Sequence, residues 1–520
     1  MHERAHYSNG TSLVGRVWAA FLRPVDALPI DLFRVCVGLV LIVYFFRTLM
    51  EVNDFSGPDG LLDHSLILKM YWFTEIGIFR TWMGVEWFYA AFSIAIACCL
   101  PLILGYRVKL FSLILYVIAI STYRRNFLVM YVDDSIMHLL LFWMLLMPVG
   151  RTLVLGEWLR DRSAAWERWK FVKVPGATLR LFFWNLTLLY LVAGLWKWTS
   201  PMWLDGSALY VVFKLPISYF HDYWGTQHIP VLRVFNYVTL VLEPLVPLMF
   251  VLPRWSRLKV VMLFAFLGLH LGSVATLNIP FANFACAATV ILMFREELMQ
   301  MLRGGYREFT EQRSPATFGL SGAFALFMVT TLTLAMVSSV SLINWRTATR
   351  EHAKQSDQVL TTTEAEHQRQ LTDGRNEGLR SMQMVFFGTL WIIGIAQQYQ
   401  LFNWIDDRNY STKYSVTVDN EEVDPDDMFQ RSLRGVLLDF YIHDITWMRV
   451  ASEDRAKLRE SILERTANRY CREYTPRGQV KVYSSIHRVD PKGGDANPNS
   501  ILLMEFSCGD RDTAVFIAGP

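Results

Sequence analysis

The chain has 520 residues, of which 53% are hydrophobic and only 19% are charged, and its mean hydropathy is +0.25. A soluble chain typically carries about 25% charged residues, so the composition disfavours an ordinary soluble enzyme and a disordered protein. The 50 basic and 47 acidic residues give a formal net charge of only +3, which provides no large basic face for nucleic acid. The composition therefore predicts a protein whose main partner is the lipid bilayer.

Apolar segments long enough to cross a bilayer, which takes about 20 residues, recur along the chain. They lie near 31–50, 85–105, 107–123, 134–150, 178–197, 233–252, 258–275, 278–295 and 317–344, and a weaker tenth covers 382–402. In lipid, continuous apolar runs of this length satisfy their backbone only as helices. We therefore predict an all-α polytopic membrane bundle of nine or ten transmembrane helices, followed by a small soluble α+β domain.

The same pattern divides the chain into six parts. They are a cytoplasmic N-terminal segment 1–30, a transmembrane domain 31–315, an additional transmembrane helix 316–345, a charged linker 346–381, a transmembrane or interfacial helix 382–404 and a soluble domain 405–520. In the last part, β-rich runs such as "QVKVYSSI" accompany the helical run "SEDRAKLRESILERTANRY". We expect this domain to fold independently, with few contacts to the helices, because the composition changes sharply after the linker.

Lys and Arg in the loops indicate the orientation, because cytoplasmic loops carry an excess of them. With the N-terminus inside, the inner segments hold 19 Lys and Arg and the outer segments hold 5. The sequence thus predicts a multi-pass cell (inner) membrane protein with a cytoplasmic N-terminus. The C-terminal domain is cytoplasmic if 382–402 crosses the membrane, and outside if that segment lies in the interface. Cys471 and Cys508 are expected to pair if their domain faces an oxidising compartment.

The stretch 190–207, "YLVAGLWKWTSPMWLDGS", carries Lys197 at the outer end of an apolar helix. Its aromatic and acidic neighbours are further site candidates: Trp196, Trp198, Trp203 and Asp205. An ammonium group at mid-helix costs about 2.5–3.5 kcal/mol on insertion scales. Two interpretations stay open: Lys197 extends its charge to water from an aromatic belt, or it is a desolvated amine that acts as a base near neutral pH.

Other ionisable residues also lie at membrane depth. His270 falls in mid-helix, where a histidine is either a packing residue or functional, and Glu243 lies in an apolar helix. Intramembrane carboxylates usually face the bundle interior and pair, so we expect Glu243 to pair with Lys197 or His270. We further expect Lys197, Glu243 and His270 to converge on one cavity in the outer half of the bundle.

Two acidic residues and one arginine complete the candidates. Asp133 and Asp134 open a predicted helix and serve either as a helix cap or as site residues. Arg34, in the first apolar segment, either pairs with one of the acids or faces the inner headgroups. The scattered histidines show no metal-ligand spacing, so the sequence predicts no metal site.

Several dispersed segments match one family in the right order. "AGLWKW…W-DG" is similar to the signature "Y-x-x-AG-x-x-K-x…W-x-x-G", and "DLFRVCVGLVLIVYFF" resembles a first helix with an Arg and a Gly, here Arg34 and Gly38. "LGYRVKLFSLILY" resembles the turn between helices two and three, "LEPLVPL" a Glu-bearing sixth helix, and "LGLHLGSVATLNIPFANF" a His-bearing helix. Over about 20–300, the chain resembles the HTTM (horizontally transferred transmembrane domain) superfamily.

That superfamily includes vitamin K-dependent γ-carboxylases and a maturation factor for a bacterial sporulation-delaying peptide toxin. Lys197 falls where the carboxylases keep the Lys that deprotonates vitamin K hydroquinone. The resemblance implies a lysine-based site in the outer membrane half, acting on a quinol, another lipid-soluble molecule or a peptide, with a quinone or hydroquinone as cofactor. The carboxylases have a Lys pair where this chain has Trp196-Lys197, and a functional His near the position of Arg151, which argues against authentic γ-glutamyl carboxylation.

Two further functions stay open beside such an enzyme. One is a non-catalytic membrane factor that binds a secreted peptide or small protein and matures or exports it, as in the toxin-maturation branch. The other is a transporter, which is disfavoured because no Gly/Pro-broken helix pair recurs in two matching halves.

Overall fold

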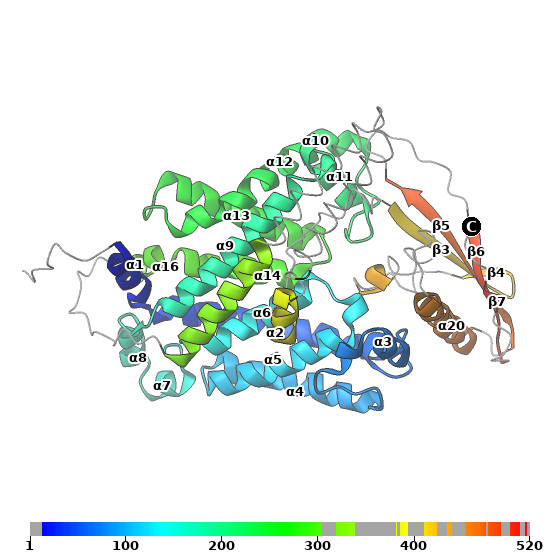
Figure 1. Cartoon of the computed structure of the whole chain (residues 1–520), viewed down its shortest axis with the longest axis horizontal. Helices are drawn as coiled ribbons and strands as arrows, with labels where there is room; N and C mark the ends of the chain where they lie inside the picture. Colours follow the sequence, from blue (N-terminus) through cyan, green and yellow to red (C-terminus); the bar gives the residue numbers. More distant parts are fainter. Residues whose placement is uncertain are drawn as a thin grey trace, which may run out of the picture.

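A computed structural model describes residues 13–303, 319–337, 381, 385–393, 410–423, 434–438, 453–474, 477–489, 500–509 and 515–516. Most of these residues are helical, and a small β-sheet lies near the C-terminus (Figure 1). Within the described ranges, six helices are long and apolar enough to cross a membrane. They are Ala27–Met50, Val85–Ile103, Ala177–Lys197, Thr226–Phe250, Arg257–Thr276 and Leu320–Val337.

Helices occupy each of the nine predicted spans, six of them long and apolar enough to cross a membrane, and shorter helices lie between these spans. In chain order they are α1 (Leu13–Leu22), α2 (Ala27–Met50), α3 (His64–Met70), α4 (Val85–Ile103), α5 (Val108–Arg125), α6 (Val132–Leu146), α7 (Leu155–Arg160), α8 (Arg162–Trp169), α9 (Ala177–Lys197), α10 (Pro201–Asp205), α11 (Ala208–Lys214), α12 (Ile229–Leu245), α13 (Arg257–Thr276), α14 (Pro280–Ala288), α15 (Val290–Met293) and α16 (Arg295–Arg303). The predicted span 278–295 is divided into α14 and α15 at Thr289, whose hydroxyl donates to the Cys286 carbonyl over 2.6 Å. Of the tenth candidate, 382–402, the structure describes only 385–393, which is helical.

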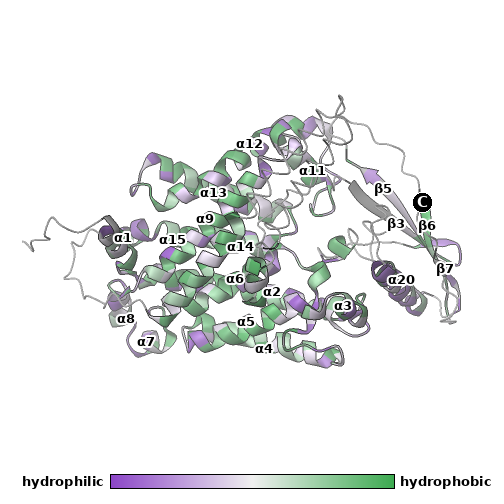
Figure 2. Ribbon diagram, viewed as in Figure 1, coloured by the Kyte–Doolittle hydropathy of each residue, from purple (hydrophilic) through white to green (hydrophobic). Residues whose placement is uncertain are grey.

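Figure 2 colours most of the bundle helices as hydrophobic, and many large apolar side chains on these helices are exposed. On α12, one exposed stripe at helical spacing is wholly apolar: Val231, Val234, Phe235, Val238 and Val241. The buried face of the same helix is partly polar and includes Asn236, Thr239 and Glu243. A helix with apolar side chains outside and polar ones inside has the opposite pattern to a helix on a soluble protein, and this pattern suits contact with lipid.

The two ends of the bundle collect different segments (Figure 1). We call the end with α1, α7, α8 and α16 the inner end, and the end with α3, α10 and α11 the outer end. At the inner end, β1 (Val25–Asp26) pairs with β2 (Lys173–Val174), and Arg303 forms an ion pair with Asp26. Segments predicted to share a side of the membrane therefore lie together.

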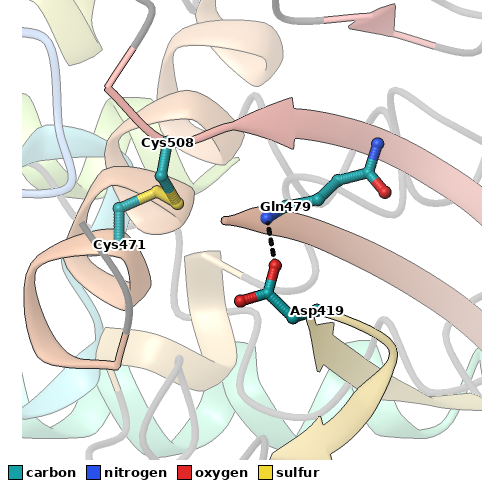
Figure 3. The surroundings of a disulfide bond; sticks show 4 residues. All are labelled: Asp419, Cys471, Gln479 and Cys508. Carbon is teal, nitrogen blue, oxygen red and sulfur yellow. Dashed lines mark hydrogen bonds between the residues drawn. A yellow bond between two sulfur atoms is a disulfide. The ribbon is translucent and has the colours of Figure 1, made fainter. Parts of the chain in front are cut away.

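The C-terminal region forms a five-stranded antiparallel sheet in the order β4-β3-β5-β6-β7. Its strands are β3 (Tyr410–Val418), β4 (Glu421–Val423), β5 (Gln479–Arg488), β6 (Ser500–Ser507) and β7 (Val515–Phe516). Helix α20 (Glu453–Glu473) packs on β5 and β6. A disulfide joins Cys471 of α20 to Cys508, directly after β6 (Figure 3). Close by, the Gln479 backbone N–H donates to Asp419 over 2.8 Å.

The expectation that this region makes few contacts with the helices is wrong. Helix α20 packs on α3 at the outer end, and the two regions share an apolar cluster that includes Leu62 and Ile462. Arg469 binds Asp54 over 2.7 Å, and Arg465 donates to the Gly60 carbonyl over 2.9 Å. The change in composition after the linker does not separate the two regions, because basic residues of α20 contact one acidic outer loop.

Candidate functional site

Lys197 and Glu243 form a buried ion pair near the outer end. Lys197 is the last residue of α9, Glu243 lies on α12, and their Nζ and Oε2 atoms are 2.6 Å apart. The lysine side chain is 1% exposed and the glutamate side chain 10%. Lys197 therefore does not extend its charge to water, and the expected partnership with Glu243 is present.

Glycine in the "AGLWK" motif explains why the two helices come close enough for this pair. A Cβ atom added at Gly194 would lie 2.8 Å from Cδ of Pro244 on α12. Gly194 is one helical turn before Lys197, and Pro244 directly follows Glu243. The absence of a side chain at Gly194 thus allows the close packing of α9 on α12 that brings the amine to the carboxylate.

Three tryptophans near the pair differ in burial and in hydrogen bonding. The Lys197 Nζ lies 5.3 Å from the ring centroid of Trp203, which is buried, a geometry that attracts a cation to the ring. Trp196 is buried, and its Nε1–H has no hydrogen-bond partner among the described residues. Trp198 is half exposed and donates to the Leu240 carbonyl over 2.9 Å.

The loop after Lys197 is fixed by backbone contacts. Asp205 is exposed and accepts the Ser207 backbone N–H over 2.8 Å, so it acts as a turn residue. Gly206 has a φ of 83°, which favours glycine, and ends α10. The buried Asn236 on α12 donates to the Trp203 carbonyl over 2.8 Å, which holds this loop against the helix of Glu243.

His270 belongs to a second buried polar group, with Tyr190 and Asn283. The Asn283 amide donates to the Ile279 carbonyl over 2.7 Å, which leaves its oxygen facing His270 Nδ1 at 2.8 Å. This arrangement assigns the proton to Nδ1 of a neutral imidazole, so that Nε2 accepts the Tyr190 hydroxyl over 2.9 Å. His270 is thus held in one tautomer by residues that the sequence analysis missed.

The three predicted residues are only partly brought together. Tyr190 and Lys197 lie on the same helix, seven residues apart, which corresponds to about 10 Å at 1.5 Å per residue. Glu243 contacts Lys197 directly, whereas the hydrogen bonds of His270 go to Tyr190 and Asn283. Tyr190 was detectable in sequence, because it is the first residue of the quoted signature.

Asp133 and Asp134 have separate roles at the start of α6. Asp133 accepts the backbone N–H groups of Phe281 and Ala282, at 3.2 and 2.7 Å, in the first turn of α14. Carboxylates are favourable at helix N-termini, so Asp133 caps a helix distant in sequence. Asp134 accepts the Tyr44 hydroxyl over 2.7 Å and forms an ion pair with Arg434.

Arg34 lies at the inner end, far along the chain and the bundle from Lys197. It is fully buried and pairs with Asp31 over 2.9 Å, and it also donates to the Ile103 carbonyl over 2.7 Å. Asp31 in turn accepts the backbone N–H of Thr152 over 2.7 Å. Both expectations for Arg34 are therefore wrong, because its partner is an acid one turn away on α2, a spacing that the sequence displays.

The chemistry available here comes from the ion pair and its aromatic surroundings. Within the described residues, no group of three His, Cys, Asp or Glu side chains is placed to hold a metal ion. No family model, curated protein or solved structure matches the chain. The site's role is therefore argued from its own geometry.

Proposed function

We propose that the chain is a multi-pass membrane enzyme of the HTTM superfamily, with nine or ten spans and a cytoplasmic N-terminus. Its Lys197–Glu243 pair acts on a quinol or another lipid-soluble molecule. The single observation that carries this proposal is a lysine 1% exposed and bound to one carboxylate over 2.6 Å, at the outer end of apolar helices. Intramembrane ionisable pairs of this kind commonly mark functional sites, because they are costly to place there.

The orientation proposal also assigns a side to the C-terminal region. Its helix α20 packs on α3, within the segment 51–84 that carries few basic residues and is predicted to be outside. The Cys471–Cys508 disulfide agrees with an oxidising compartment, where such bonds persist. The C-terminal domain therefore belongs outside the cytoplasm.

A hydroquinone headgroup fits the residues of this site. Trp196 offers a buried N–H without a partner among the described residues, and Trp203 offers a flat apolar ring beside Lys197. A bound hydroquinone would supply an acidic hydroxyl and, with O2 as the oxidant, redox chemistry. Lys197 Nζ would accept the hydroxyl proton after passing one of its own protons to Glu243 Oε2.

The ion pair makes that exchange possible without a change of net charge. A proton that moves from Nζ to Oε2 converts a charged pair into a neutral one across a 2.6 Å hydrogen bond. The amine is then a free base in a site that excludes water, where a general base typically contributes 10²–10⁴-fold to the rate. Glu243 is thus the acceptor that frees Lys197.

The test is consumption of a hydroquinone under air by purified wild-type, Lys197→Ala and Lys197→Arg proteins at matched amounts. We expect both variants to lose activity by about 100-fold or more, since Arg remains protonated at any usable pH. Thermal unfolding of each variant checks that the fold persists. A fully active Lys197→Arg protein would contradict the proposal.

A second candidate is a non-catalytic factor that binds a secreted peptide for maturation or export. It is favoured by the disulfide-bonded domain at the outer end, where a secreted peptide would arrive. The Lys197→Ala variant distinguishes the two functions. An enzyme would lose turnover in this variant, whereas a peptide-binding factor would still bind its peptide. Maturation of the peptide in cells that carry this variant is the deciding measurement.

A further inference from the structure

The hairpin of α7 and α8 exposes an apolar face at the inner end of the bundle (Figure 1). On α7, Leu155, Trp158 and Leu159 have the spacing i, i+3 and i+4, which places them on one face of the helix. All three side chains are exposed, and Leu159 is 69% exposed. A helix on a water-facing surface normally turns its apolar face toward the core. Within the described part of the chain this face stays uncovered, so it is available to an external partner.

The two helices of the hairpin are fixed to each other. Glu157 on α7 forms an ion pair with Arg168 on α8 over 2.5 Å, and it also accepts the Nε1–H of the buried Trp169 over 2.8 Å. Between the helices, Asp161 caps α8 by accepting the Ala164 backbone N–H over 3.0 Å. The exposed apolar face therefore belongs to a folded hairpin with a defined orientation.

This apolar face continues the exposed apolar surface of the longer helices. The Leu155 backbone N–H donates to the Leu104 carbonyl over 3.0 Å, so α7 begins directly beside the turn between α4 and α5. Leu104 and Tyr106 in that turn, and Leu110 on α5, are large and exposed. The face of α7 thus lies where the surface that suits lipid reaches the inner end of the bundle.

Positive charge without a counter-charge borders the same face. Segment 151–180 contains seven Lys and Arg but three acidic residues, and those three are engaged, two in ion pairs and one as the cap of α8. Arg160 and Arg162, on either side of the cap, are exposed, and neither lies within ion-pair distance of a carboxylate among the described residues. The Arg162 guanidinium carbon lies 5.0 Å from the ring centroid of Trp158, so this charge adjoins the apolar face.

We propose that the α7–α8 hairpin lies in the headgroup layer of the membrane and binds anionic phospholipid there. The apolar side chains of α7 contact the acyl chains, and Arg160 and Arg162 donate to the phosphate, whose oxygens match the guanidinium fork. Amphipathic helices with aromatic residues on one side and basic residues on the other lie in the membrane interface in this way, and tryptophan is enriched at headgroup level. Lipid binding at this hairpin does not depend on the proposed activity of Lys197.

Only an anionic lipid matches both features of the hairpin. A soluble phosphate neutralises the two arginines but leaves the apolar face in water. A zwitterionic lipid covers the apolar face but brings no net negative charge to the arginines. The hairpin should therefore select a lipid by its headgroup charge when the acyl chains are the same.

The experiment measures which lipid contacts the hairpin in the full-length protein. The protein is placed in nanodiscs of phosphatidylcholine that contain a small fraction of a photoreactive lipid, either phosphatidylglycerol or phosphatidylcholine with the same diazirine-bearing acyl chain. After illumination, peptide mass spectrometry measures the labelled fraction of segment 152–173. The measured quantity is the ratio of phosphatidylglycerol labelling to phosphatidylcholine labelling at this segment.

In the wild type we expect the ratio to be well above one. Arg160→Gln and Arg162→Gln should each lower it by about fivefold, and the double variant should bring it close to one, since each basic residue near the surface contributes separately to the attraction. Arg254→Gln is the matched control. Arg254 is also exposed at the inner end, but it already has a carboxylate partner, Glu296, at 2.8 Å, so its replacement should leave the ratio unchanged.

A second variant separates the apolar contribution from the charge. Leu159→Gln should reduce labelling of the hairpin by both lipids and leave their ratio as in the wild type, because it removes apolar contact but no charge. Since all the replaced side chains are exposed, the variants should unfold thermally at the same temperature as the wild type.

Three outcomes would overturn the proposal. The first is equal labelling by the two lipids in the wild type. The second is a double arginine variant that keeps the wild-type ratio, or an Arg254→Gln protein that loses the ratio to the same extent. The third is a preference that an excess of glycerol phosphate abolishes, which would assign the arginines to a soluble phosphate instead of a lipid headgroup.

Discussion

The outer and inner ends of the bundle each contain one buried lysine–glutamate pair. At the outer end Lys197 binds Glu243, and at the inner end Lys259 binds Glu297, both over 2.6 Å. Each ammonium also faces an aromatic ring, Trp203 at 5.3 Å and Phe294 at 4.7 Å. By residue type, distance and burial, the two pairs are nearly the same.

Their positions in the helices differ. Lys259 and Glu297 are each the third residue of a helix, α13 and α16, so the inner pair ties two helix beginnings together. Lys197 ends α9 and Glu243 lies within α12. The two helices pack closely there, with Gly194 of α9 against Pro244 of α12. A buried ion pair by itself therefore says little about function. The packing of the helices around each pair is what distinguishes the outer pair from the inner pair.

The largest expected difference is in activity. Lys197→Met should reduce hydroquinone consumption by about 100-fold or more, because it removes the general base. Lys259→Met should change the rate little, since Lys259 pairs with Glu297 of α16, at the opposite end of the bundle from the proposed site. The rates are measured on purified proteins side by side. Comparable losses in both variants would mean that the two pairs are equivalent structural elements.

Stability should respond to the loss of a carboxylate at either end. Glu243→Gln and Glu297→Gln each leave a buried ammonium without its counter-charge, which costs about 3–5 kcal/mol when one partner of a buried pair is removed. We expect Glu297→Gln to lose more, because its side chain is 1% exposed and that of Glu243 is 10% exposed. Denaturant unfolding in detergent measures both.

The double variants sharpen this test. Lys259→Met combined with Glu297→Met removes the whole inner pair, and such replacements by apolar residues are often neutral or stabilising. The corresponding outer double variant should be equally stable but inactive. An outer double variant that unfolds would show that the outer pair is needed for the fold.

Whether the sequence predicted a buried ion pair depends on where its charged residues lie relative to the apolar segments. The Lys197–Glu243 pair was predictable, because each residue interrupts an apolar segment where an unpaired charge is costly. Lys259 was only one of the basic residues counted at the inner side, and Glu297 was not considered, since each lies at the edge of a segment, where a charge needs no partner. The Arg34–Asp31 pair was visible as an i, i+3 spacing, but Asp31 was not considered.

Apart from the Lys197–Glu243 pair, contacts between distant parts of the chain were not predictable from one sequence. Arg434 lies in the C-terminal region, about 300 residues from its partner Asp134, and no local pattern connects them. Asn283 and Asn236 are single amides in apolar or mixed helices, and only the structure shows what they bind. The bundle itself was predictable, because hydropathy and span length follow from solvation of the backbone in lipid.

A smaller effect is expected from the glycine that lets the outer pair form. Gly194→Ala places a Cβ atom 2.8 Å from Pro244 Cδ, and such overpacking typically costs about 1–3 kcal/mol. Gly268→Ala on α13 is the matched control, because an added Cβ there meets no atom within 4 Å. Thermal unfolding should separate the two variants. A Gly194→Ala protein as stable as Gly268→Ala would show that α9 and α12 are not closely packed at this point.

The smallest expected effect is a pH dependence confined to the outer end. His64 begins α3 outside the spans, is 7% exposed and contacts the Phe55 carbonyl over 2.9 Å. Burial, with a further contribution from the positive charge of Arg125, lowers the pKa of His64 from 6.5 to about 3. Above pH 6.5 the imidazole is neutral in both the folded and the unfolded protein, so it has no effect on stability there.

As the pH falls below 6.5, the unfolded chain binds a proton that folded His64 does not, so the free energy of unfolding falls by up to about 1.4 kcal/mol per pH unit. Replacement His64→Gln removes this contribution, and the variant should lose less stability than the wild type between pH 6.5 and 5.5. Denaturant unfolding at the two pH values measures the difference, in a window above the titration of ordinary carboxylates. The inner end has no such group among its described residues, since α1, α7, α8 and α16 contain no histidine. Identical pH dependence in wild type and variant would mean that His64 is accessible to water, and that the contact between α3 and α20 is looser than its burial indicates.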